Sequence, residues 1–260
     1  MKEILDFPEK TGYGKGELVR VQNRLFEMAI AVRDVLESFH IPYMIAYGTL
    51  LGAIRHRDFI PWDDDFDFNL FDDTYEVAIE ALRANLPKEM FLEDSKTEPH
   101  YFHGWAHVKD LGTIATCGKW EQDNAYAHKG LHIDLYRIKK MKGGDVKSYL
   151  DNENKEYLER RRQNGLISEA EYMRRKSAMS LSSPVPDIFK DIDGYAMINI
   201  YKCKFVPAQI VEPLSSCSFR GSKFACPGSP DKMLRSIYGE YLTLPPYVKR
   251  LPSLDKVVFK

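Results

Sequence analysis

The feature that most constrains the fold is an acidic segment enclosed by bulky apolar residues. Three aspartates, Asp63, Asp65 and Asp67, alternate with other residues within the run Phe59–Asn69. Side chains two residues apart in a strand project to the same face, so this pattern predicts a strand that directs three carboxylates into one cleft. The apolar flanks indicate that the segment enters a core, where unpaired charges are costly. Such a row of carboxylates predicts a cation site.

The expected cation is Mg²⁺, with Mn²⁺ as the alternative ion. Mg²⁺ usually takes one or two protein carboxylates and fills its other positions with water and substrate phosphate. A solvated acidic turn is the competing interpretation of an aspartate cluster, and the apolar flanks argue against it. A calcium loop of the EF-hand type is excluded, because Phe68 stands where glycine is needed and Thr74 where glutamate is needed.

A short turn upstream of the acids predicts a phosphate site. Gly48 and Thr49 follow the apolar run 41–47 and precede the apolar run 50–54. We expect a strand, a tight turn and a short helix whose first turn is capped by Thr49. The unpaired N–H groups and the dipole at a helix start favour anions. A structural turn is the alternative interpretation of this Gly-Thr pair.

Asp134 is a further acidic candidate in a strand pattern. It lies between Ile133 and Leu135 in the segment 130–136, and a buried aspartate there needs a partner. We expect a third carboxylate of the metal site. A surface strand carboxylate or a structural ion pair is the alternative.

Three segments resemble the LicD family, to which the fukutin-type transferases are related. They are Gly48-Thr-Leu-Leu-Gly-Ala-Ile-Arg-His56, Phe59-Ile-Pro-Trp-Asp-Asp-Asp-Phe-Asp67 and Lys129-Gly-Leu-His-Ile-Asp134. The segments 219–227 and 238–246 also resemble the closing part of that family, so the resemblance extends over about residues 20 to 250.

The resemblance implies a fold and a set of functional residues. The family has a nucleotidyltransferase-like fold and transfers a phosphorylated small group, typically phosphocholine or an alditol phosphate, from a CDP-activated donor to a glycan hydroxyl. By resemblance, Asp65 and Asp67 are paired metal ligands and Asp134 is the third acid. Asp63 is a further ligand or an orienting neighbour. Arg55 is a candidate for phosphate contact, because a guanidinium bridges two phosphate oxygens.

The middle strand departs from the family pattern. Relatives tend to carry Ala-Lys-x-Arg-Asp, whereas this chain has Ala106-His-Val-Lys-Asp110. Lys109 keeps one cation and His107 replaces the other, so both are candidates for donor phosphate contact. A packed or exposed histidine is the alternative interpretation of His107. The departure leaves donor identity open.

Phosphocholine as the transferred group would favour an aromatic cage around its trimethylammonium group. The expected walls are Trp62, Trp105, Trp120 and Tyr126. A polyol phosphate would instead need hydroxyl-binding polar groups.

The main functional prediction is a Mg²⁺-dependent phosphotransferase that modifies lipopolysaccharide, capsule or a teichoic acid precursor. One alternative is a glycosyltransferase that uses an Asp-x-Asp motif on a nucleotide-sugar. Such folds usually place a nucleotide-binding unit of about a hundred residues before the motif, and 62 residues precede Asp63 here. The other alternative is a catalytically silent domain that binds metal or nucleotide.

Composition limits the partners. The net charge of −1 gives no global attraction to polyanions, which argues against nucleic acid. The basic clusters Arg160–Arg162 and Arg174–Lys176 are expected to be solvated helix faces, with acceptor-glycan or membrane contact as the alternative. Four cysteines without paired short spacing suit a reducing compartment. We therefore expect a cytoplasmic enzyme, with peripheral contact at the inner face of the membrane when the acceptor is lipid-linked.

The predicted fold class is α+β, a nucleotidyltransferase-like mixed sheet flanked by helices with a helical insert or appendage. We expect a catalytic core at 1–144, a helical insert at 145–205 and a C-terminal segment at 206–260 that completes the catalytic domain. Apolar residues at three- and four-residue steps between Leu18 and Phe39 predict an amphipathic helix. A second helix is expected from Thr74 to Leu86, before Pro87.

Overall fold

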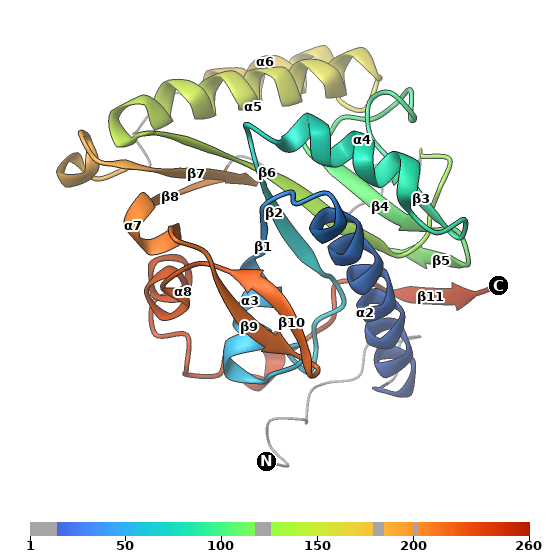
Figure 1. Ribbon diagram of the computed structural model, residues 1–260. Coiled ribbons are helices and arrows are strands. Elements are labelled where there is room, and N and C mark those ends of the chain that lie inside the picture. The colour runs from blue at the N-terminus through green and yellow to red at the C-terminus, as the bar shows by residue number, and fades with distance from the viewer. Residues whose placement is uncertain (1–14, 118–125, 179–184, 200–201) are drawn as a thin grey trace.

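A seven-stranded mixed sheet forms the centre of the molecule (Figure 1). The computed structural model describes residues 15–117, 126–178, 185–199 and 202–260. Five strands follow the order β1 (Tyr43–Ile45), β2 (Asp67–Phe71), β6 (His132–Lys142), β4 (Ala106–Asp110) and β3 (Met90–Glu93). β7 (Asp193–Asn199) pairs with the second half of β6, and β8 (Lys202–Pro207) pairs with β7. β2 and β6 are parallel while the other neighbours are antiparallel, which confirms the predicted mixed sheet of an α+β fold.

Two amphipathic helices cover the apolar face of this sheet. They are α2 (Lys15–Ser38) and α4 (Tyr75–Asn85), and both were predicted from the sequence. The stripe of α2 is buried as expected, except that Phe39 lies beyond the helix and is 52% exposed. α4 ends before Pro87 because the residue preceding a proline is restricted to extended backbone, and Leu86 adopts ψ of 148°.

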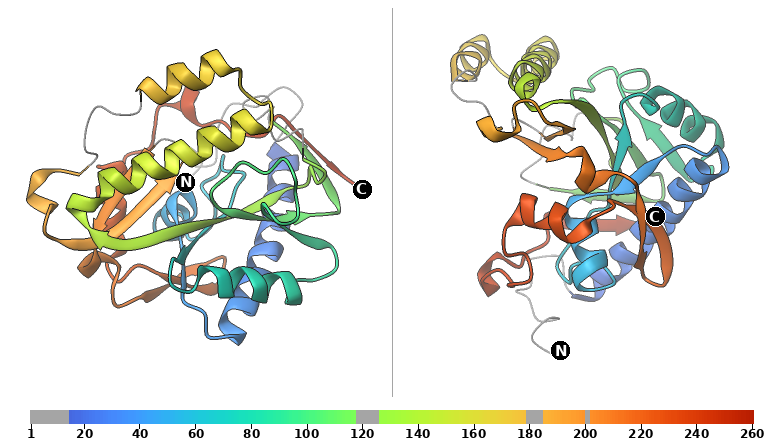
Figure 2. Two further views of the ribbon diagram at one scale, coloured as in Figure 1. Left: turned by 90° about the horizontal axis from the view of Figure 1, so that it is seen from above. Right: turned by 60° about the vertical axis from the view of Figure 1, so that its left-hand side comes forward.

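The predicted insert 145–205 contains helices and strands. Its two expected polar helices are α5 (Val146–Gln163) and α6 (Glu169–Ala178), joined at Gly165 with φ of 69°. Figure 2 shows these helices together, apart from α2 and α4. The short 3₁₀ turns η2 (Gly143–Asp145) and η3 (Asp187–Phe189) flank them. The range predicted as a helical insert also contains β7 and the greater part of β8, which extend the main sheet.

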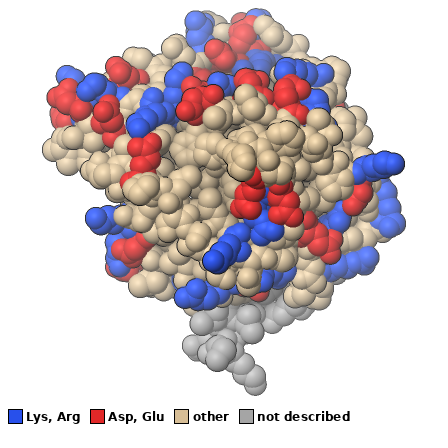
Figure 3. All heavy atoms as spheres, in the orientation of Figure 1, with Lys and Arg blue, Asp and Glu red and all other residues tan. Residues whose placement is uncertain are grey.

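Charges on α5 and α6 are paired with one another. Figure 3 shows cationic and anionic side chains interspersed over this layer. Arg162 contacts Glu159 and Glu169, while Arg174 and its neighbour Arg175 contact Glu171. These residues of the two basic clusters therefore lie on ion-paired helix faces.

The C-terminal segment packs on the elements that precede the acidic segment. β9 (Ser215–Phe219) and β10 (Ser222–Cys226) form a hairpin, flanked by α7 (Ala208–Val211) and α8 (Pro230–Tyr238). Positive φ angles at Arg220 and Gly221, 49° and 79°, are those of a two-residue type I′ turn. α8 packs on α3 (Tyr47–Arg55), and after η4 (Tyr247–Lys249) the strand β11 (Lys256–Phe259) pairs with β5 (Thr113–Thr116). Among the described helices, none combines the length and apolar character that crossing a bilayer requires.

Candidate active site

The acidic segment lies in the connection between α3 and β2. Only Asp67 belongs to the strand, so the prediction that Asp63 and Asp65 also lie on it is wrong. A turn at residues 61–62 precedes them, and the amide of Gln22 donates a hydrogen bond of 2.8 Å to the carbonyl of Asp63. This side chain from α2 occupies a backbone acceptor that a strand neighbour would otherwise use. The alternation nevertheless persists, since the odd-numbered positions 63 and 65 are partly exposed and their even-numbered neighbours are buried.

The even-numbered residues anchor the segment. Asp64 accepts hydrogen bonds from the backbone N–H groups of Ser253 and Leu254, at 3.0 and 2.6 Å. The ring of Phe66 packs on Phe219 with ring centroids 5.2 Å apart. The apolar flanks noted in the sequence therefore hold the loop against the core, while Asp63 and Asp65 remain at the surface of the site.

A polar row runs across four neighbouring strands. The strand register pairs Asp67 with Asp134, Asp134 with His107, and His107 with Glu93. Residues that are directly paired project to the same face of a sheet. The apolar residues that alternate with these polar residues along each strand pack beneath α2 and α4, so the polar row occupies the opposite face of the sheet. The parallel β2–β6 ladder thus brings together two acids that are far apart in the sequence.

Asp134 is surrounded by hydrogen-bond donors. Its Oδ1 lies 3.0 Å from His107 Nε2 and accepts a hydrogen bond of 2.6 Å from the indole N–H of Trp105. Its Oδ2 lies 3.8 Å from His132 Nε2. Burial alone would raise the pKa of Asp134, but the hydrogen bond and charge of His107, assisted by His132 and Trp105, hold that pKa well below its usual range. This carboxylate is therefore ionised throughout the neutral range.

The electrostatic environment of Asp63, Asp65 and Asp67, before and at the start of β2, is opposite to that of Asp134. Burial, followed by the neighbouring carboxylates Asp64 and Asp134, raises the pKa of Asp65 to about 7. Burial and the same kind of crowding raise the pKa of Asp63 and of Asp67 well above the usual range. Each charge makes the next more costly, because like charges at short range disfavour ionisation. A bound cation is the ordinary compensation for such a group.

The described residues contain one compact set of metal-type side chains on this face. Ligand atoms of His107, His132 and Asp134 all lie within 4.8 Å of one another. His132 belongs to the Lys-Gly-Leu-His-Ile-Asp segment, but it was not singled out as a ligand. The signal was available, because positions 132 and 134 of one strand share a face.

Gly48 and Thr49 lie in the first turn of α3. A Cβ at Gly48 would stand only 2.6 Å from Asp63 Oδ2, so the glycine permits the helix start to approach the acids. The predicted cap by Thr49 is wrong. The helix begins at Tyr47, after Ala46, and the Thr49 hydroxyl instead accepts a hydrogen bond of 2.9 Å from the N–H of Asp67. This contact fixes the helix start to the first residue of β2.

Arg55 closes α3 beside the acids. Its Nη1 donates a hydrogen bond of 2.6 Å to the carbonyl of Tyr241. Burial lowers the pKa of Arg55, and the charge of Asp63 partly offsets that effect, which places the two groups in the same electrostatic neighbourhood. Arg55 thus joins the acids to the C-terminal segment.

His107 and Lys109 share an inner partner. Glu93 Oε2 lies 3.5 Å from His107 Nδ1 and 3.5 Å from Lys109 Nζ, and all three residues are buried. Burial alone would lower the pKa of His107, but its contacts with Asp134 and Glu93 raise it. The structure therefore places Lys109 behind His107, with its ammonium directed to Glu93 on β3. Glu93 was not expected from the sequence.

The expected aromatic walls do not form one group. Trp62 lies in the main core with the guanidinium of Arg250 over its ring, whereas Trp105 and Tyr126 both pack on His103. The fourth predicted wall, at position 120, lies outside the described residues.

Tyr238, at the end of α8, is a further neighbour of the acids. The residue is 43% exposed, and desolvation of the phenol, followed by the charges of Asp67, Asp63 and Asp65, raises its pKa. Tyr238 begins one of the C-terminal segments quoted for the family resemblance, yet no role was predicted for it.

The comparisons with known proteins identify the segment that carries this site. The family model described as LicD/FKTN/FKRP, nucleotidyltransferase domain, matches residues 40–160. That range contains α3, the acidic segment, His107, Lys109 and Asp134.

Individual relatives cover different shares of the chain. The lipopolysaccharide cholinephosphotransferase LicD of Haemophilus influenzae is 22% identical over 252 residues, which are 88% of this chain and 95% of that protein. The ribitol 5-phosphate transferase FKRP of Homo sapiens is 47% identical over 47 residues, only 18% of this chain and 10% of that protein. An uncharacterized protein of Rickettsia typhi is 26% identical over 157 residues, 52% of this chain and 46% of its own length. Residues 40–160 are therefore similar to the nucleotidyltransferase domain of the LicD family, and the similarity to the Haemophilus influenzae protein extends over most of the chain.

Proposed function

We propose that this chain is a Mg²⁺-dependent phosphotransferase. It moves phosphocholine, or an alditol or sugar phosphate, from a CDP-activated donor to a hydroxyl group of a cell-surface glycan in lipopolysaccharide, capsule or a teichoic acid precursor. The observation that carries the proposal is the pairing of Asp67 with Asp134, beside Asp63 and Asp65, in a domain whose relatives are named as phosphotransferases. A cytoplasmic location, with contact to the inner face of the membrane for a lipid-linked acceptor, belongs to the same proposal.

The residues fit a hard cation better than a nitrogen-bound one. His107 has a carboxylate oxygen near each ring nitrogen, at 3.5 and 3.0 Å, and when the ring is protonated both nitrogens donate and neither offers a lone pair to a metal. Carboxylate oxygens are the ligands that Mg²⁺ and Mn²⁺ prefer. We therefore assign the ion to Asp65, Asp67 and Asp134, with Asp63 as a further ligand or an orienting neighbour. When bound, it would neutralise charge on the donor phosphates and the leaving nucleotide.

Asp134 is assigned to metal binding and not to proton transfer. A carboxylate whose pKa is held far below neutrality is a weak base, and efficient general bases have a pKa near the working pH. His107 and Trp105 also fix the orientation of the Asp134 carboxylate through Oδ1. Such partners of a ligand set its geometry and its charge.

The start of α3 supplies the anion-binding side of the site. N–H groups in a first helical turn have no partner within the helix, and the helix dipole adds positive potential there. Gly48 lets this turn lie against Asp63, so a donor phosphate bound by the amides of Gly48 and Thr49 adjoins the acids. Arg55, two turns later, offsets the charge of Asp63.

The test is a melting-temperature panel with Mg²⁺, followed by turnover assays. CDP-choline, CDP-ribitol, CDP-glycerol, UDP-sugars and GDP-sugars are compared in wild type and Asp65→Asn, because a ligand that binds the native state raises its melting temperature. We expect stabilisation by one CDP-linked donor, lost in the variant, and Mg²⁺-dependent release of CMP. Stabilisation only by UDP- or GDP-sugars would identify a glycosyltransferase, and tight binding without turnover on any acceptor would identify a silent domain.

A further inference from the structure

A polar groove adjoins the acids at the start of β4. Two neighbouring cavities share Gly104, Trp105, Arg137, Glu153 and Arg160 in their walls. The larger has a volume of about 330 Å³, within the roughly 300–1,000 Å³ typical of small-molecule sites. One side of the groove is α5, and the other is α4 with the segment that leads into β4.

Trp105 connects this groove to the acids. Its ring lines both cavities, while its indole N–H donates the 2.6 Å hydrogen bond to Asp134 Oδ1. Tyr136 packs on the same indole with ring centroids 4.8 Å apart. The indole of Trp105 therefore lies between a ligand in the groove and the predicted metal ligand Asp134.

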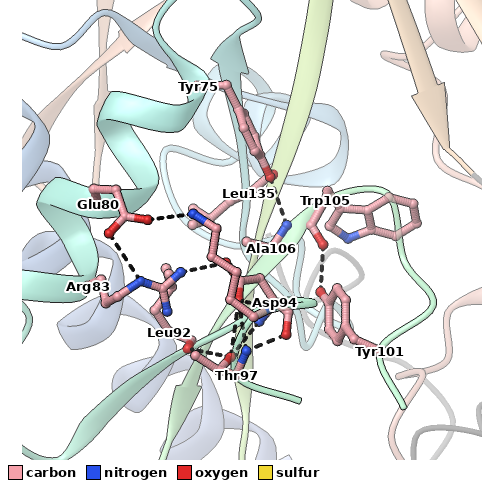
Figure 4. A network of polar contacts seen from close by, with 11 residues as sticks. Tyr75, Glu80, Arg83, Leu92, Asp94, Thr97, Tyr101, Trp105, Ala106 and Leu135 are labelled. Atoms are coloured by element: carbon pink, nitrogen blue, oxygen red, sulfur yellow. Dashed lines mark hydrogen bonds and ion pairs between the residues drawn. The ribbon is translucent and has the colours of Figure 1, made fainter. Parts of the chain in front are cut away.

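The α4 side of the groove is held in place by backbone contacts (Figure 4). The hydroxyl of Tyr75 donates to the carbonyl of Leu135 at 3.1 Å and accepts from the N–H of Ala106 at 2.8 Å. The hydroxyl of Tyr101 donates to the carbonyl of Trp105 at 2.6 Å. These contacts fix the position of Trp105 relative to the sheet.

The segment before β4 is held by a second set of contacts, also visible in Figure 4. The N–H of Asp94 donates to the hydroxyl of Thr97 at 2.9 Å, and Arg83 contacts the Asp94 carboxylate at 2.5 Å. Lys96 pairs with Glu80 of α4 at 2.8 Å. This wall is therefore preorganised, which lowers the entropic cost of binding.

The α5 side presents polar groups to the opening at Gly104. Glu153 Oε2 and Arg160 Nη2 lie 3.6 and 3.7 Å from the position that a Cβ would occupy at Gly104. Arg160 is oriented by a hydrogen bond of 3.1 Å from its Nε to the carbonyl of Phe102. A carboxylate and a guanidinium thus lie at Gly104, next to Trp105, which lines the same cavities.

The charge of the groove indicates the class of ligand. The larger cavity is lined by four carboxylates and three cations: Glu76, Asp94, Glu153, Glu156, Lys96, Arg137 and Arg160. This near balance does not favour a nucleotide diphosphate. A sugar has an apolar C–H face that packs on an aromatic ring, and hydroxyl groups that both donate to carboxylates and accept from guanidinium groups.

We infer that this groove binds a neutral sugar unit of the acceptor glycan, with the ring of the sugar against Trp105 and its hydroxyls on Glu153 and Arg160. The identification of that sugar as the acceptor rests on the proposed transferase function. The sugar-binding property itself rests on the groove.

The experiment measures the binding of three methyl glycosides, those of glucose, galactose and N-acetylglucosamine, by saturation-transfer NMR and tryptophan fluorescence. The variants are Glu153→Gln, which removes an acceptor charge, and Gly104→Leu, which fills the groove. The matched control is Glu169→Gln, an exposed carboxylate on α6. We expect the affinity for the glycosides to fall about tenfold or more in both groove variants and to stay unchanged in the control. A lost hydrogen bond to a charged group has an effect of this size. Melting temperatures verify that each variant is folded.

Equal binding of the glycosides in all four proteins would overturn the inference. Binding of choline chloride or CMP in the groove, lost in Gly104→Leu while no glycoside binds, would also overturn it. Turnover of CDP-choline is measured separately. Sugar binding that the groove variants abolish, in a protein that turns over no CDP-linked donor, supports the sugar site and contradicts the proposed function. Turnover with unaffected sugar binding contradicts the site alone.

Discussion

Asp134 and the acids of the segment before β2 are neighbours with opposite electrostatic environments. Asp134 has a histidine and an indole N–H on one oxygen, and its pKa is lowered. Within the part of the chain that the structure describes, neither Asp65 nor Asp67 forms an ion pair, and their pKa values are raised. His107 and Trp105 therefore compensate the charge of Asp134, whereas no ion pair among the described residues compensates that of Asp65 or Asp67.

The difference separates carboxylates that the fold itself stabilises from carboxylates that it leaves crowded. Structural carboxylates in this chain have partners, as Asp64 does with two backbone N–H groups. Carboxylates that remain crowded raise the free energy of the folded state, and such groups are functional candidates. Variants of the individual carboxylates and of their partners test this contrast.

The largest expected effect is on catalysis. Asp65→Asn should reduce transfer by about 10³-fold, because removal of one charge-stabilising group at a reaction centre has effects of that order. The measurement is Mg²⁺-dependent CMP release from the CDP-linked donor, with circular dichroism to confirm the fold. Full activity in this variant would refute the assignment of Asp65.

The next effect is on metal affinity. His107→Gln removes the ring that orients the Asp134 carboxylate, so Mg²⁺ binding measured by calorimetry should weaken about 10–100-fold, as for other partners of metal ligands. His100→Gln, an exposed histidine, is the control. Unchanged affinity in His107→Gln would mean that Asp134 is not a ligand.

Asp64→Asn should affect stability instead. The amide replaces one acceptor oxygen with a donor facing a backbone N–H, and a buried unsatisfied group costs about 1–3 kcal/mol. Chemical denaturation measures the loss, and transfer per folded molecule should be retained. A variant with normal stability and no activity would place Asp64 in the reaction centre.

Without metal, Asp65→Asn should raise the melting temperature at pH 8 by at least roughly 2 °C. The raised pKa of Asp65, about 7, means that the folded state binds more protons than the unfolded state between about pH 4 and 7. Its contribution to stability is therefore present at low pH and lost as pH rises through that window. The difference between variant and wild type should vanish near pH 4, and added Mg²⁺ should stabilise wild type more. A stabilisation independent of pH would contradict this cause.

The smallest effect on stability is expected for loss of a surface charge on α6. Arg174 is 73% exposed and pairs with Glu171 on the surface of α6, so Arg174→Gln should leave the melting temperature unchanged within error. Scanning fluorimetry at low and high salt is the measurement. A marked loss of stability would show that the charges of this layer contribute to the fold.

The fold class was predictable because periodicity and breakers act locally. The repeat of apolar residues predicted α2, and Pro87 predicted the end of α4. β7 and β8 were not predictable in the same way, because their pairing with β6 depends on contacts between segments that are distant in the sequence. Whether such a short segment becomes a strand depends on its hydrogen-bonded pairing with a neighbouring strand.

The LicD resemblance is confirmed by the family match, while the roles of the individual residues stay proposals. Alternation identified Asp63, Asp65 and Asp67 as a group, but it could not show that the strand begins only at Asp67. The error over Thr49 has a related cause. Tyr47 adopts φ of 42° and starts the helix two residues earlier, a conformation that its residue type does not suggest.

The contacts of Asp64 with Ser253 and Leu254 have a consequence for synthesis of the protein. A ribosome extends the chain from its N-terminus, so the acidic segment emerges long before residues 253 and 254 are made. During that interval, the two backbone N–H groups that donate to Asp64 are missing, and the loop that carries Asp63 and Asp65 lacks one of its anchors. The acidic segment therefore gains this contact only after translation of the distal segment.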